Sequence, residues 1–166
     1  MVISELMNKQ DIYDYLERKG IRHEVTEHGA VFNMEELDAV EMPHKDRLAK
    51  NLFVRDDRKE NYYLITVMGE RRVDLKEFKK TFGTRHLTFA GEEDMKRMLG
   101  VLPGSVSPFG MLNDSEHKVK FFVDRSFLEG DGLIGIHPND NTATVWLNTE
   151  DLLTVIRGQG NEIQYL

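Results

Sequence analysis

The spacing of apolar positions predicts helices and short strands that alternate along the chain. Ile12, Tyr15 and Leu16 form an i, i+3, i+4 stripe between a capping Asn8 and Gly20, which is typical of an amphipathic helix. Capping residues, among them Asn33 with Glu36 and Asp74 with Glu77, or terminal glycines delimit the other expected helices. These cover residues 34–40, 75–82, 92–99 and 149–157, the last ending at Gly158.

Apolar runs that flank turn residues predict strands and hairpins. The expected hairpins pair 48–54 with 62–68, 109–112 with 118–123, and 133–136 with 142–147. Single strands are expected at 21–26, 86–89 and 162–165. Together these elements predict an α+β fold with a mixed, mostly antiparallel sheet and surrounding helices.

The length of the chain fits one domain covering residues 1–166, because domains commonly contain about 100–200 residues. The chain has no cysteine, which excludes disulfides, thiolate metal sites and a cysteine nucleophile. Its start has neither a basic region nor a cleavable apolar stretch, and no apolar run is long enough to span a membrane. We therefore expect a cytoplasmic protein without membrane association.

Charge is unevenly distributed along a chain whose net charge is −7. Residues 45–97 carry 14 basic and 10 acidic side chains, whereas the segments on either side are acidic. A positive segment inside an acidic protein indicates either a local contact with a polyanion or a solvated face with ion pairs. The basic residues considered for contact with a polyanion are Lys45, Arg47, Arg71, Arg72, Lys76, Lys79 and Lys80.

Several common catalytic motifs are absent from the sequence. There is no Walker loop, GxGxxG, GxSxG or HExxH pattern, so we expect no cofactor and no metal of those types. A metal site assembled from distant histidines stays open at this point. Any hydrolytic chemistry has no evident side-chain nucleophile.

Three segments carry the informative pattern. In the first, Leu48–Val54, Lys50 interrupts an apolar strand. The second is the loop Gly104-Ser-Val-Ser-Pro108, and the third is Gly135-Ile-His-Pro-Asn139 at the end of a strand. In this order they resemble the YbaK-like, prolyl-tRNA synthetase-associated editing-domain superfamily, and most closely its free-standing prolyl-tRNA editing branch of PrdX and ProXp-ala type. The resemblance covers nearly the whole chain.

The resemblance implies a barrel-like fold, a role in hydrolysing mischarged tRNA, and a set of pocket residues. Lys50 would contact the tRNA 3′ end, Gly104 would begin a loop that lines the aminoacyl pocket, and His137 would position substrate or water. The residues expected to bind substrate are Asn51, Ser105, Val106, Ser107 and Pro108. No metal or cofactor is expected, and the partners are aminoacyl-tRNA and, as an open question, prolyl-tRNA synthetase.

The residues themselves leave structural alternatives open. Alternation places Lys50 on the same strand face as Leu48 and Leu52, where a lysine either extends past an apolar edge or holds an anion. Asn51 points to the other face of the strand, and a polar side chain there is typical of a residue at a strand edge. The Gly104–Pro108 loop could be only a rigid turn, although a glycine also lets backbone amides approach an oxyanion. His137 also suits a hairpin turn.

The expected activity is therefore hydrolysis of the ester in a mischarged tRNA(Pro), with alanyl-tRNA(Pro) as substrate. Two alternatives stay open. Removal of cysteine or serine would need the same chemistry and a different pocket. A non-catalytic module that binds tRNA ends or a synthetase would need no chemistry at all.

Overall fold

The computed structural model describes residues 6–166, so the start of the chain, where we expected no targeting segment, lies partly outside the described residues. Asn8 and Asp11 form a reciprocal capping box at the start of the first helix, as the sequence predicts. The α-helices are α1 (Lys9–Arg18), α2 (Met34–Asp38), α3 (Leu75–Phe82), α4 (Glu92–Asp94) and α5 (Thr149–Gln159). A π-helical turn, Met95–Leu99, continues α4, and 3₁₀ turns cover Lys45–Arg47, Pro108–Asn113 and Arg125–Leu128. In residues 6–166, no helix is long and apolar enough to cross a membrane.

Eight strands form two sheets in the described chain. They are β1 (His23–Glu27), β2 (Ala49–Asp56), β3 (Tyr62–Met68), β4 (Leu87–Phe89), β5 (Val119–Val123), β6 (Leu133–Ile136), β7 (Ala143–Asn148) and β8 (Ile163–Tyr165). The smaller sheet has the order β1-β7-β6, and the larger has the order β4-β2-β3-β5-β8. The β2–β3 and β6–β7 hairpins are antiparallel, while β5 pairs in parallel with β3 and β8. This confirms the predicted α+β class with a mixed sheet.

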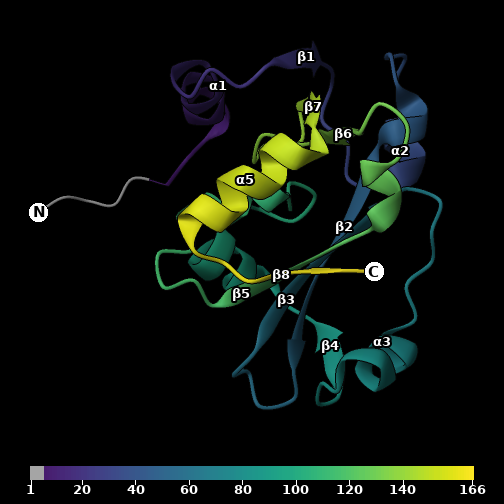
Figure 1. Ribbon diagram of the computed structural model, residues 1–166, viewed down its shortest axis with the longest axis vertical. Helices are drawn as coiled ribbons and strands as arrows, with labels where there is room; N and C mark the ends of the chain where they lie inside the picture. Colours follow the sequence, from purple (N-terminus) through teal and green to yellow (C-terminus); the bar gives the residue numbers. More distant parts are fainter. Residues whose placement is uncertain (1–5) are drawn as a thin grey trace, which may run out of the picture.

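The main core lies between the two sheets and beneath α1 and α5. Phe53 of β2, Phe121 of β5, Val145 of β7 and Leu152 of α5 are among its buried members. Figure 1 shows α5 lying across the strands. A second core, which includes Phe78 of α3, covers the other face of the larger sheet. Successive residues of β2 therefore enter different surroundings.

The two sheets meet at one point but do not close into a barrel. Leu48 forms a parallel bridge with Gly135, the only isolated bridge in the described chain. Gly135 packs directly under Trp146, where an added Cβ would lie 2.3 Å from Cζ3 of the indole. Beyond this bridge, β4 pairs only with Val54–Asp56 at the far end of β2. Within residues 6–166, the earlier part of that β2 edge has no partner strand.

Two sequence predictions about local structure are wrong. Residues 109–112 form a 3₁₀ turn and not a strand, because Ser107 caps the backbone and Pro108 occupies the first turn. Its apolar residues are buried, and a short apolar run cannot by itself distinguish strand from helix. The last helix continues past Gly158 and ends at Gln159, where Gly160 forms the C-cap with a φ of +103° that suits glycine.

Candidate functional site

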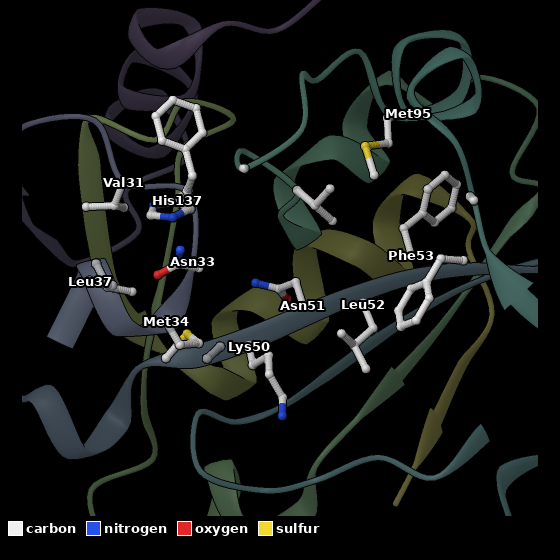
Figure 2. A pocket seen from close by; sticks show the side chains of 16 residues that line it. Val31, Asn33, Met34, Leu37, Lys50, Asn51, Leu52, Phe53, Met95 and His137 are labelled. Carbon is white, nitrogen blue, oxygen red and sulfur yellow. The ribbon is translucent and has the colours of Figure 1, made fainter. Parts of the chain in front are cut away.

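A pocket of about 340 Å³ lies along the unpartnered edge of β2. The segment before and within α2 and the residue His137 border it on one side, and the end of β4 and Met95 border it on another (Figure 2). Its lining is mostly apolar. The lining residues are Val31, Phe32, Asn33, Met34, Leu37, Ala49, Lys50, Asn51, Leu52, Phe53, Phe89, Ala90, Met95, Gly104, Val106 and His137.

Five of the eight residues predicted for the site border this pocket. They are Lys50, Asn51, Gly104, Val106 and His137, which come from three distant parts of the chain. Ser105, Ser107 and Pro108 do not line it. All three of those residues are buried, and the Ser107 hydroxyl accepts a hydrogen bond from the Phe109 amide. The structure thus gives Ser107 a capping position.

Lys50 and Asn51 leave β2 on opposite faces, as strand alternation requires. The Lys50 ammonium donates to the backbone carbonyl of Arg71. Figure 2 shows the Asn51 carboxamide directed into the hollow, whereas the Lys50 ammonium lies beyond the other side of the strand. In this conformation, Lys50 contributes its aliphatic stem to the pocket and Asn51 contributes its polar group.

The orientation of Asn51 is fixed by the neighbouring strand. The hydroxyl of Thr66, which is fully buried, donates a 2.6 Å hydrogen bond to Oδ1 of Asn51. The amide nitrogen Nδ2 is then the part of the carboxamide left to donate. Asn51 therefore presents an N–H donor to the pocket.

The main chain of Asn51 adds to the same edge. Leu48 and Asp56 bond through their main chains to Gly69 and Asn61 beyond β3, so even-numbered residues of β2 face that strand. In an antiparallel pair, the intervening residues direct their N–H and C=O groups to the opposite edge. The main-chain groups of Asn51 consequently face the edge that bears the pocket.

His137 is held as a hydrogen-bond acceptor toward the site. Its Nδ1 lies 2.8 Å from the carbonyl oxygen of Ala143, which can only accept, so Nδ1 carries the proton. Burial lowers the pKa of His137 below 6.5, and nearby His28 acts in the same direction. The neutral ring leaves Nε2 as an acceptor.

Gly104 reaches the pocket with a backbone that favours glycine. Its φ is +88°, and an added Cβ would lie 3.1 Å from Cδ1 of Phe32. The Ser105 amide is bonded within the turn to the carbonyl of Leu102. In residues 6–166, no hydrogen bond engages the amides of Gly104 and Val106. These two N–H groups are available to a bound anion or carbonyl.

Several residues of the pocket wall were not predicted from the sequence. Asn33 was identified only as a helix cap, a role that it has through the amide of Glu36. Phe32, Phe89 and Met95 were not singled out, because an apolar residue carries no signal of its exposure in a single sequence. Glu36, which the sequence pairs with Asn33 in a capping box, does not line the pocket, but its carboxylate accepts from the amide of Phe32.

No group of three or more His, Asp or Glu residues suited to a metal ion occurs in the described residues. Among residues 6–166, the lining of the pocket contains no hydroxyl, thiol or carboxylate side chain. Water is therefore the simplest nucleophile for a hydrolytic reaction here.

Comparison with known proteins identifies the family. The aminoacyl-tRNA editing domain family matches residues 28–155. The prolyl-tRNA editing protein ProX of Acetoanaerobium sticklandii is 35% identical over 153 residues, covering 92% of this chain and 93% of its own. The prolyl-tRNA synthetase associated domain-containing protein 1 of Bos taurus is 38% identical, covering 86% and 84%. A solved structure of a candidate trans-editing enzyme for prolyl-tRNA synthetase has 20% identity and a TM-score of 0.68, with 98% of both chains covered, and shows the same fold. This chain belongs to the aminoacyl-tRNA editing domain family.

Proposed function

We propose that residues 1–166 act as one editing domain that hydrolyses the ester of alanyl-tRNA(Pro) in trans. The observation that supports this most directly is the pocket itself, where Asn51, Gly104, Val106 and His137 border a mostly apolar hollow. Two related proteins are named for prolyl-tRNA editing or for association with prolyl-tRNA synthetase. By this proposal the partners are aminoacyl-tRNA and, through it, the prolyl-tRNA synthetase that mischarges it.

The proposed reaction uses donors for the ester and an acceptor for water. The Asn51 Nδ2 and the amides of Gly104 and Val106 would hold the carbonyl oxygen as negative charge develops on it. The Nε2 of His137 would accept a proton from the attacking water or from the neighbouring ribose hydroxyl. Water bonds to the carbonyl carbon, the ester C–O bond breaks, and the ribose oxygen leaves with a proton. The products are alanine and free tRNA.

The energetic demand on this site is modest. An aminoacyl ester is already reactive, and a thousandfold acceleration needs only about 4 kcal/mol of barrier reduction. Positioning of the ester together with one or two oxyanion donors can supply that amount. A protein nucleophile is not required.

The proposed specificity follows from the size of the aminoacyl group. A synthetase pocket built for proline rejects smaller alanine weakly, because missing methylenes change binding by only about 1–3 kcal/mol. An editing pocket that admits alanine and excludes the pyrrolidine ring would complete the discrimination. The apolar side chains of Met34, Leu37 and Met95 are candidates for that steric limit.

The test is single-turnover hydrolysis of tRNA(Pro) carrying alanine, cysteine, serine or proline. We expect rapid loss of alanine and no loss of proline. Preferential loss of cysteine or serine would support ester hydrolysis but would identify a different aminoacyl-tRNA as the substrate. Tight binding without loss of any ester would identify a tRNA-binding module and would contradict the proposal.

A further inference from the structure

Two of the fifteen aromatic Phe, Tyr and Trp residues of the chain are exposed, and both border the pocket. Phe32 is 65% exposed and Phe89 is 62% exposed, whereas the others are buried or partly buried. They mark different ends of the hollow. Phe32 adjoins α2, and Phe89 ends β4. Each ring therefore marks a route by which an RNA strand whose end enters the pocket can leave it.

Charge distinguishes the two exits. The exit beside Phe32 runs over α2, whose exposed side chains include Glu35, Glu36 and Asp38. Lys45 lies near this helix, but its ammonium donates to the carbonyl of Asp38. This exit would repel phosphates.

The exit beside Phe89 leads along β4 to a basic hollow of about 720 Å³. Lys76, Lys79 and Lys80 of α3 line it together with His86, which directly precedes β4. Figure 1 shows α3 and β4 side by side. None of these three lysines forms an ion pair in the described chain. Asp74 also borders the hollow, but its carboxylate accepts from two amides as the cap of α3.

Two other cations that were considered for this contact, Arg47 and Arg71, are already engaged. Arg47 donates to the carbonyls of Leu133, Phe127 and Glu129, and Arg71 pairs with buried Asp124 at 3.1 Å. Two acidic residues of the same segment also form ion pairs, Asp57 with Arg85 and Glu92 with Lys96. The α3 lysines are thus the part of the segment best placed for a polyanion.

We propose that single-stranded RNA leaves the pocket across Phe89 and along β4, with its next phosphates on Lys76, Lys79 and Lys80. Extended chain from His86, just before β4, to Phe89 spans about 10 Å, which suits one or two nucleotides. Phe89 offers an exposed ring for base stacking, and β4 is an edge strand of its sheet. This inference rests on the proposed function, because it assumes that an RNA terminus occupies the pocket.

Affinity for uncharged RNA tests the path independently of catalysis. The probes are a hairpin RNA with a short unpaired 3′ end and the same hairpin with a blunt end. We expect the full-length protein to prefer the unpaired end, and Phe89→Ala to weaken that binding by about 5- to 100-fold. Val25→Ala, which trims an exposed apolar residue of β1 away from the pocket, should leave the affinity unchanged.

The lysines are tested by the salt dependence of the same binding. Replacing Lys76, Lys79 and Lys80 by Ala together should lower the slope of log affinity against log salt by roughly two. Replacing the exposed Lys19, Lys96 and Lys118 provides a control with the same change of charge. Equal slopes of log affinity against log salt in the two triple variants would contradict the proposed RNA path.

Other outcomes separate this inference from the proposed function. If Phe89→Ala loses RNA affinity and the parent protein hydrolyses no ester, the RNA path is supported and the proposed deacylase activity is contradicted. If the parent protein hydrolyses alanyl-tRNA(Pro) and Phe89→Ala keeps its RNA affinity, the deacylase activity is supported and the RNA path is contradicted. Reduced binding of prolyl-tRNA synthetase and unchanged RNA affinity in that variant would also overturn the path, because Phe89 would then belong to a protein interface.

Discussion

The 2.6 Å hydrogen bond from the Thr66 hydroxyl to Oδ1 of Asn51 sets which end of the carboxamide faces the pocket. Thr66 is fully buried on β3 between β2 and β5, so this donor has no access to water as an alternative partner. Buried polar groups are costly when left unpaired, which favours one rotamer of Asn51. The pair therefore converts a strand residue into an oriented N–H donor.

Replacing Asn51 by Asp should abolish most of the deacylase activity. The substitution removes the Nδ2 donor and places a carboxylate where negative charge would develop on the substrate. Loss of one oxyanion donor commonly costs 10²–10³ in rate, so we expect a decrease of at least about 100-fold in single-turnover hydrolysis of alanyl-tRNA(Pro).

Thr66→Val provides the matched variant, because it keeps the shape of the side chain and removes the hydroxyl. We expect a smaller decrease in rate, with Asn51 retained but no longer held. Equal activity of Asn51→Asp and the parent protein would remove Asn51 from the site.

Lys50→Ala should reduce deacylation of alanyl-tRNA(Pro) tenfold or more. The ammonium binds the Arg71 carbonyl here, and its flexible stem lets it turn toward a phosphate or ribose oxygen of the bound terminus. The lost hydrogen bond should cost only about 1 kcal/mol of stability. Single-turnover rates and urea unfolding of the same variant separate the two roles. A rate equal to that of the parent, or a rate loss explained entirely by unfolding, would assign Lys50 a structural role.

Gly104→Ala should impair both stability and substrate binding. A left-handed backbone costs a non-glycine residue about 1–2 kcal/mol, and the new Cβ would press on Phe32 at the pocket border. Gly91→Ala is the control, since Gly91 lacks a positive φ and has open space around its Cα. Urea unfolding and the KM for alanyl-tRNA(Pro) provide the measurements. Identical behaviour of the two variants would show that the Gly104 conformation is not needed.

Local signals were sufficient to predict most of the elements. Asn8 and Asp74 were identified as caps from residue type and spacing, and both accept the expected amides. The β2–β3 hairpin followed from two apolar runs around a charged turn. These features depend on residues close together in sequence, which is why periodicity and capping could predict them.

Features set by distant contacts could not be predicted in this way. Pairing of β5 with β3 and β8, and the Leu48–Gly135 bridge, join segments far apart in the chain. The exposure of Phe32 and Phe89 depends on which strand edge stays unpaired, and a single sequence does not carry that information. Strand alternation did place Lys50 and Asn51 on opposite faces, but the Arg71 carbonyl that holds the lysine belongs to the tertiary fold.

The lowered pKa of His137 predicts a pH dependence of both folding and activity. In the unfolded chain its imidazole titrates near the ordinary value of about 6.5, whereas burial keeps the folded ring neutral to lower pH. Between these two pKa values the unfolded state binds more protons, so stability falls as the pH drops below about 6.5. The acid limb of the single-turnover rate should likewise lie below pH 6.5, where Nε2 becomes protonated and can no longer accept.

His137→Gln should weaken this pH dependence. In urea unfolding at neutral and mildly acidic pH, the variant should lose less stability on acidification than the parent protein. His86→Gln, at an exposed position, should behave like the parent. Titration of the His137 ring by NMR gives the most direct measurement. A pKa at or above 6.5 in the folded protein would contradict the acceptor role, because the ring would then be partly cationic near neutral pH and would donate from Nε2.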